Sequence, residues 1–245
     1  GAIAISAAKQ AQGEGTAWHR LLEGRALVFV SMTILAVLVG GVAEIVPSLL
    51  VQPDAAAIAD VHPYTALELE GRDVFIREGC YNCHSQMIRP FRFEQQRYGE
   101  PSKMSDSQYD HPFQWGSKLT GPDFAREGGK YPNLWHYQHL MDPRSVSAGS
   151  NMPPYAFLAS QTVDSERTPD KLHAMKSIGV PYTDDDIKLA VPDEKAQAAG
   201  IAADLKAAGA DVAPGSDVVA LIAYLQRLGK QPGAARPSLN VSMNK

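Results

Sequence analysis

The hydrophobic residues of this chain are concentrated in one block near the N-terminus. Residues 26–43 (ALVFVSMTILAVLVGGVA) carry no charge, and after Glu44 the apolar run continues to Val51. A helix needs about 20 mostly apolar residues to cross the hydrocarbon core of a bilayer. The block is apolar on every face, whereas a helix on the surface of a soluble core has a single apolar stripe. The pattern therefore predicts a transmembrane anchor helix over residues 26–51.

A buried core helix and a cleaved signal peptide are the alternatives for this block. Arg20 and Arg25 precede it, and the small residues 55–59 resemble a cleavage site. The apolar region of a signal peptide is only about 7–15 residues long, which is shorter than this run. An uncleaved anchor is therefore the preferred interpretation.

The charges that flank the block predict its orientation. Lys9, Arg20 and Arg25 lie before it, and no Lys or Arg follows until Arg72. Because positively charged flanks stay in the cytoplasm, residues 1–25 are expected inside and the chain after about residue 52 outside.

Beyond residue 60 the pattern predicts separate helices. Thr65 followed by Glu68 is a capping box, which opens a helix to about residue 78. Residues 85–155 are rich in Pro, Gly, Trp and Tyr and show no alternating strand pattern, so they are expected to form long loops with short helices. The predicted fold is mainly α.

The C-terminal part contains further helix signals. Thr183 precedes three aspartates and starts a helix that Pro192 is expected to end, and residues 193–208 form the next helix. Ser216 is expected to cap a last helix over residues 217–228, closed by Gly229. The apolar residues of this helix recur at helical spacing: Val218, Leu221, Ile222, Leu225 and Leu228.

Composition narrows the class of protein. The 245 residues are 44% hydrophobic and 20% charged, which fits one or two folded domains. The net charge of −4 provides no basic field for nucleic acid, so that class of partner is excluded. With two cysteines in the chain, a disulfide-rich scaffold is excluded as well.

Both cysteines fall in one pentapeptide, residues 80–84 (CYNCH), which is the pattern of covalent c-type haem attachment. In that chemistry the thiols of Cys80 and Cys83 add to the two vinyl groups of the haem. The adjacent His84 is then placed under the iron as its proximal ligand. The motif predicts one covalently bound haem c.

Three alternatives compete with haem attachment. A redox-active dithiol should follow a strand, and the sequence predicts none there. A zinc site would need distant histidines, because there is no second cysteine pair. The third alternative is chance. The predicted location outside the membrane, where haem is attached, favours the haem.

A methionine is expected as the sixth ligand of the iron, since Met/His ligation suits electron transfer. Met152 lies in a proline-flanked loop (SNMPPY, residues 150–155) that could present its thioether stiffly. The alternative is that Met152 only fills a gap in the core. Met104 and Met141 are the next candidates, and the loop histidines are set aside. The latter are His111, His136 and His139.

Several long segments carry a resemblance to a known family. They are residues 40–47 (GGVAEIVP), 79–92 (GCYNCHSQMIRPFR), 109–118 (YDHPFQWGSK), 120–123 (TGPD), 142–144 (DPR) and 150–153 (SNMP). On these segments the chain resembles the mono-haem cytochrome c subunit (CcoO, also called FixO) of cbb3-type cytochrome c oxidases. The resemblance covers roughly residues 18–228. Leu119 and Pro154 depart from the expected pattern, and neither is at a ligand position.

The resemblance implies a class I cytochrome c fold for a periplasmic domain over residues 60–229, followed by a tail, 230–245. In that fold the carbonyl of Pro122 accepts a hydrogen bond from the proximal histidine, and Met152 is the distal ligand. The last helix would pack across the helix before the haem. The chain would cross the bacterial inner membrane once.

The resemblance also implies a function and partners. The chain would be an electron-transfer subunit without catalysis of its own. It would accept electrons from the di-haem subunit (CcoP) or another c-type donor and pass them to haem b of the catalytic subunit (CcoN), which reduces oxygen to water. A small accessory subunit and the lipid bilayer are further expected partners. A free-standing tethered cytochrome and a haem sensor with an open iron position remain alternatives.

Overall fold

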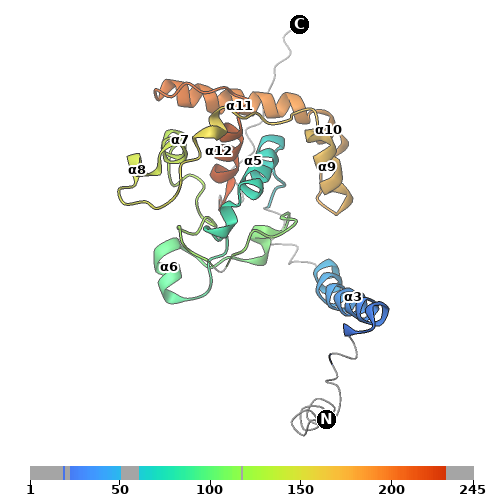
Figure 1. Cartoon of the computed structure of the whole chain (residues 1–245). Helices are drawn as coiled ribbons and strands as arrows, with labels where there is room; N and C mark the ends of the chain where they lie inside the picture. The colour runs from blue at the N-terminus through green and yellow to red at the C-terminus, as the bar shows by residue number, and fades with distance from the viewer. Residues whose placement is uncertain (1–18, 20–22, 51–60, 117, 230–245) are drawn as a thin grey trace. The chain divides into compact units, whose positions relative to one another are not determined.

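The computed structural model describes residue 19 and residues 23–50, 61–116 and 118–229 (Figure 1). The chain divides into two compact units, Gly1–Gln52 and Pro53–Lys245. Within the described ranges all regular elements are helices, and the β pairing is limited to an isolated bridge between Thr162 and Ser216. The mainly α fold class is confirmed. The expectations for residues 1–18 and for the tail lie outside the described residues.

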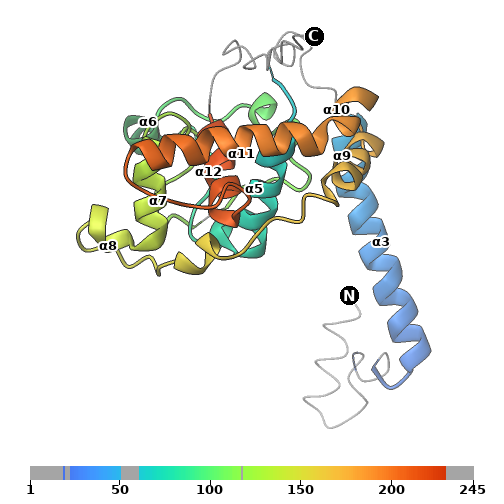
Figure 2. The same cartoon turned by 90° about the horizontal axis from the view of Figure 1, so that it is seen from above.

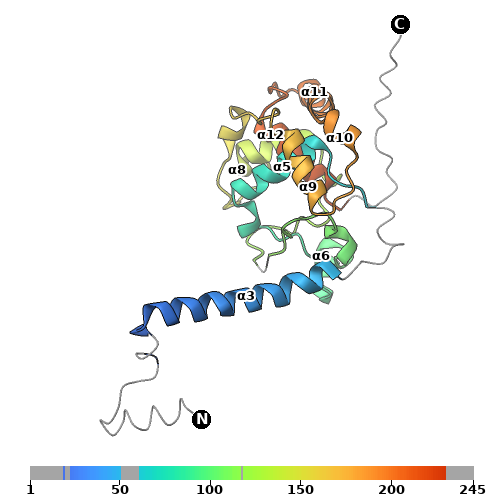
Figure 3. The same ribbon diagram turned by 90° about the vertical axis from the view of Figure 1, so that its right-hand side faces the viewer.

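The first unit contains the expected anchor helix, α3 (Ala26–Leu50), with Pro47 inside its last turn. Of its 25 residues, Ala26–Pro47 are long and apolar enough to cross a bilayer, and none of them is buried inside the protein. At about 1.5 Å per residue the helix exceeds the roughly 30 Å of a hydrocarbon core. Figure 3 shows α3 along its length.

The second unit is built from short helices joined by long loops. In chain order they are α5 (Ala66–Arg77), η1 (Cys80–Asn82), α6 (Arg92–Tyr98), η2 (Met104–Ser107), α7 (Asn133–Met141), α8 (Pro143–Val146), η3 (Ala156–Ala159), α9 (Thr168–Ser177), α10 (Asp184–Lys188), α11 (Ala190–Ala207) and α12 (Asp217–Arg227). The loop-rich character expected for residues 85–155 is confirmed.

Two predicted helix starts are present with their caps. The Thr65 hydroxyl accepts the backbone N–H of Glu68 at 3.3 Å, and the Glu68 carboxylate accepts the backbone N–H of Thr65 at 2.9 Å. Helix α10 begins with the same reciprocal arrangement of Thr183 and Asp186. Each cap satisfies backbone donors that a helix start leaves free.

One boundary prediction was wrong, and another was right for a different physical reason. Pro192 does not end a helix but is the third residue of α11, where its missing N–H has no intrahelical partner to lose. Ser216 is the N-cap of α12 as predicted, but its hydroxyl is buried without a hydrogen-bond partner and makes no capping bond. The start of α12 is held by tertiary contacts instead, since Asp217 N–H donates to the Gln161 carbonyl at 3.0 Å.

The core of the second unit is the crossing of α5 and α12, with α11 lying over both (Figures 1 and 2). A Cβ added at Gly71 would lie 1.9 Å from the Ala220 carbonyl oxygen, so the two backbones touch. Beside this contact the Tyr224 ring packs against Phe75 at 5.4 Å and Tyr64 at 5.7 Å between centroids. The expected packing of the last helix across α5 is confirmed.

The close contact at Gly71 yields a stability prediction. We expect Gly71→Ala to lower the free energy of unfolding by about 1–3 kcal/mol, because the methyl group forces the helices apart. Gly200→Ala in α11 meets open space and should be neutral or stabilising by up to about 1 kcal/mol. Urea midpoints of the full chain in detergent measure both effects. Equal midpoints for the two variants would contradict the close packing of α5 and α12.

Candidate functional site

The haem-attachment motif lies where α5 ends and the chain reverses. Gly79 adopts φ +69°, a left-handed conformation that favours glycine, and this turn starts the short helix η1. The carbonyl of Cys80 then accepts the backbone N–H groups of Cys83 at 3.1 Å and His84 at 3.0 Å. One tight turn therefore carries both thiols and the imidazole.

The two cysteines are unpaired, with Cys80 partly buried and Cys83 exposed. Burial, and secondly the nearby Glu78 carboxylate, raise the pKa of Cys80 to about 12. A redox-active dithiol needs a thiol with a depressed pKa, so this environment disfavours that alternative. No group of three or more His, Cys, Asp or Glu side chains among the described residues could hold a metal ion, which also disfavours zinc.

His84 is buried and fixed by a backbone carbonyl. Its Nδ1 donates to the Pro122 carbonyl oxygen at 2.8 Å, which is the contact expected from the resemblance. Because a carbonyl can only accept, Nδ1 carries the proton and Nε2 of the neutral ring keeps its lone pair. Burial lowers the pKa of His84, which favours the neutral form. The free Nε2 together with two unpaired thiols fits the donor set of a covalently bound haem.

Two neighbours of Pro122 shape the space around the imidazole. A Cβ at Gly121 would lie 2.2 Å from Cε1 of His84, so only a residue without a side chain fits there. The Phe124 ring stacks on the imidazole at 4.0 Å between centroids and 13° between planes. Sequence reasoning missed both roles, although Gly121 stands next to the predicted Pro122.

The segment after His84 is tied to the same loop by buried polar groups. The Asp123 carboxylate accepts the backbone N–H groups of Met87 at 3.1 Å and Ala125 at 2.7 Å. The Ser85 carbonyl accepts the N–H of Phe124 at 2.8 Å, and its hydroxyl accepts that of Gly116 at 3.2 Å. These bonds fix the loop that supplies Pro122 relative to the haem-attachment motif.

The Met152 loop packs beside the cysteines. Met152 is partly buried and contacts the same hydrophobic cluster as Cys80. Burial raises the pKa of Tyr155, and the Cys80 and Cys83 thiols raise it further, which places this part of the loop near both. The N–H of Tyr155 donates to the Leu140 carbonyl of α7 at 2.8 Å, which anchors the loop.

Two of the histidines that were set aside as loop residues lie on helix α7, so that description was wrong. Burial is the main cause that lowers the pKa of His84, and His139 lowers it further, which places His139 near His84. The His139 ring stacks on Trp135 at 4.7 Å, and Trp135 stacks on Tyr131 at 3.9 Å. Trp135 and His139 are four residues apart in α7 and so lie on one face of that helix, a pattern visible in the sequence only once the helix is known.

Comparison with family models identifies the chain. The model described as "Cytochrome C oxidase, mono-heme subunit/FixO" matches residues 19–231. The chain belongs to the FixO family. A search of curated proteins finds no match. As a FixO protein the chain is a subunit of a cytochrome oxidase complex that includes other subunits, and it carries one haem. The family resemblance seen in the sequence is confirmed.

A cavity of about 1080 Å³ lies at the other end of α5, between the start of that helix, α11 and the end of α12. Tyr64, Gln197 and Arg227 are among the residues that line it, whereas His84 and Met152 are not. The two predicted iron ligands therefore do not line this cavity.

The buried His136 yields a pH prediction. Burial, and secondly His139, lower the pKa of His136 to about 4, below the roughly 6.5 of an unfolded histidine. Between pH 6.5 and 4 the unfolded chain binds a proton that the folded chain does not, so stability is lost as the pH falls. The loss attributable to His136 is on the order of 3 kcal/mol.

Urea unfolding of the full chain at several pH values tests this assignment. We expect His136→Gln to flatten the decline between pH 6.5 and 4 relative to the parent chain. The matched variant is His173→Gln, at an exposed position of α9, which should leave the decline unchanged. Parallel curves for parent and His136→Gln would contradict a buried neutral His136.

Proposed function

We propose that this FixO chain is a membrane-anchored electron-transfer subunit whose haem is bound covalently by Cys80 and Cys83. His84 and Met152 would bind the haem iron, and Pro122 would orient His84. The observation that carries the proposal is the 2.8 Å hydrogen bond from His84 Nδ1 to the Pro122 carbonyl. His84 directly follows Cys83 in the sequence. The hydrogen bond leaves Nε2 as the metal-binding nitrogen on the ring that follows both thiols.

When bound, the haem supplies a one-electron redox centre. The protein residues provide its position and surroundings. Pro122 fixes the tautomer and direction of the imidazole, while Gly121 and Phe124 restrict its rotation. His84 is only 8% exposed, so water has little access to the histidine side. A thioether from Met152 would raise the reduction potential of the bound haem.

The proposed path runs from the di-haem subunit (CcoP), or another c-type donor, through this chain to haem b of the catalytic subunit (CcoN). The chain has no catalysis of its own in this proposal. Helix α3 anchors it, with residues 1–25 in the cytoplasm and the haem domain, residues 60–229, in the periplasm. The uncharged run of α3 and the basic residues that precede it support this topology.

Covalent attachment can be tested with the denatured full chain. We expect a haem c signal in the pyridine haemochrome spectrum that stays with the polypeptide after extraction with acidified acetone, because thioether bonds survive it. Cys80→Ser and Cys83→Ser should each shift the spectrum, since one vinyl group is then left unsaturated. Extraction of all colour from the parent chain would contradict covalent attachment.

Axial ligation by Met152 can be tested separately. We expect Met152→Ala to lose the ferric methionine–iron charge-transfer band, to bind carbon monoxide in the reduced state and to have a lower reduction potential. Met104→Ala is the matched control, because Met104 is 59% exposed on η2 and lies outside the proposed ligand set. Survival of the band in Met152→Ala would show that another residue is the ligand.

A further inference from the structure

Two phenylalanines at the start of α6 are exposed to solvent. Phe91 is 50% exposed and Phe93 is 63% exposed. Their rings lie parallel, 5.9 Å apart between centroids and 5° between planes, and the Arg89 guanidinium lies 5.2 Å from the centre of the Phe91 ring. We call residues 89–93 the aromatic edge. Such a pair of exposed aromatic rings costs free energy in water unless something covers it.

The aromatic edge is held in place by a buried carboxylate. Glu94 is 1% exposed, and it accepts the Arg89 backbone N–H at 2.8 Å and the Arg89 Nε at 2.7 Å. Ile88, the residue before the aromatic edge, is held by Ser102. Ile88 N–H donates to the Ser102 hydroxyl and Ser102 N–H donates to the Ile88 carbonyl, both at 2.9 Å. The rings are therefore presented by a rigid segment.

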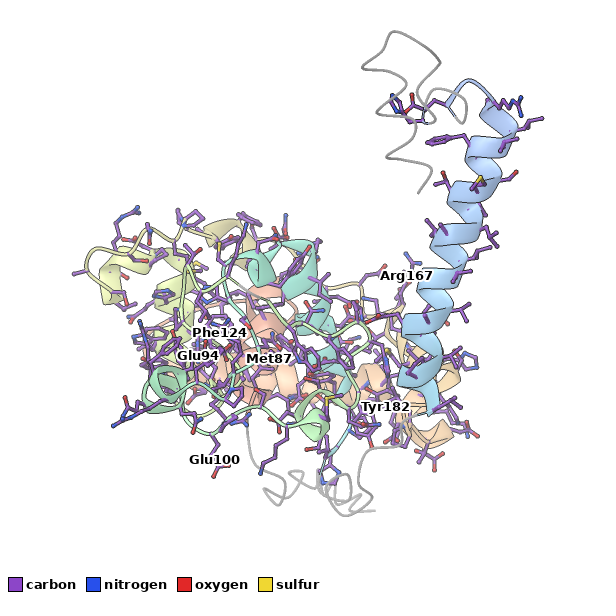
Figure 4. The ribbon with its side chains drawn as sticks, turned by 90° about the horizontal axis from the view of Figure 1, so that it is seen from below. Met87, Glu94, Glu100, Phe124, Arg167 and Tyr182 are labelled. Atoms are coloured by element: carbon purple, nitrogen blue, oxygen red, sulfur yellow. The ribbon has the colours of Figure 1, made fainter. Side chains whose placement is uncertain are left out.

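The same segment is continuous with the haem-attachment motif. Met87, three residues after His84, is bound through its N–H to Asp123, and Ile88 is 1% exposed. Figure 4 shows Met87, Glu94 and Phe124 gathered in one part of the domain. Anything that binds the aromatic edge would thus be held at a fixed position relative to His84.

The aromatic edge and the helix that follows it carry surplus positive charge. Arg92 and Arg97 are exposed, and no ion pair is described for either among the described residues. The nearest acidic groups are already engaged, Glu94 with Arg89 and Glu100 with Lys103 at 3.8 Å. A complementary surface would present apolar groups together with carboxylates.

We propose that the aromatic edge is a docking surface for an apolar, acidic patch on another subunit of the oxidase complex. The proposal deepens the proposed function, on which it rests for the haem that the docking would position. Aromatic residues and Arg are enriched at the buried centres of protein interfaces. A protein surface of fixed shape gains from rings that are already ordered before binding, whereas a fluid lipid surface does not require this order.

The test uses the full chain, tagged and purified from membranes with its complex in mild detergent. The readout is the ratio of haem b to tagged chain, which reports the other subunits directly. We expect the Phe91→Ala/Phe93→Ala variant to lower this ratio about tenfold or more. Phe157→Ala is the matched control, because Phe157 on η3 is 42% exposed and outside the edge; its ratio should equal that of the parent.

A second variant guards against loss of folding. Arg92→Glu reverses an exposed charge and should weaken the complex more at low salt than at high salt. Urea midpoints and haem c content of all variants should match the parent. An unchanged ratio of haem b to tagged chain in both variants would overturn the docking proposal. Variants that keep the complex intact but no longer bind anionic vesicles would also overturn it, in favour of a lipid surface. A parent chain without covalent haem would instead overturn the proposed function and leave the docking result interpretable.

Discussion

The hydrogen bond between His84 and Pro122 is the interaction on which the rest of the site depends. It joins two segments that lie 38 residues apart and decides which imidazole nitrogen is free. The ring cannot turn away, because Phe124 stacks on one face and Gly121 lies in contact with Cε1. In the proposed function this restraint would favour electron transfer, since a ligand of fixed direction needs little rearrangement when the charge of the metal changes.

Buried carboxylates take the place of regular secondary structure in the loops around the site. Asp123 binds the N–H groups of Met87 and Ala125, and Glu94 binds Arg89. Asp110 accepts the Tyr64 hydroxyl and the Arg72 Nε, both at 2.9 Å. Burying a carboxylate is costly unless it is paired, so each of these groups is tied to several partners. The long loops are thereby ordered without a sheet or long helices.

Local signals in the sequence were reliable where the chemistry is local. The capping boxes at Thr65 and Thr183 form as predicted because their partners lie three residues away. Ser216 begins α12 at the predicted position, but without a capping bond, and the helix start is held by Gln161, more than fifty residues earlier. The description of His136 and His139 as loop residues was wrong, because α7 has too weak an apolar pattern to be recognised before its packing is known.

The sequence by itself determined the apolar anchor segment, the haem-attachment motif and the family, because each is written in contiguous residues. Only the tertiary structure decided the tautomer of His84, the fit of Gly121 against it and the ordered rings of Phe91 and Phe93. These features depend on distances between residues far apart in the chain, and such distances are set by the crossing of α5 and α12 and by the buried ion pairs. A linear pattern carries no measure of them.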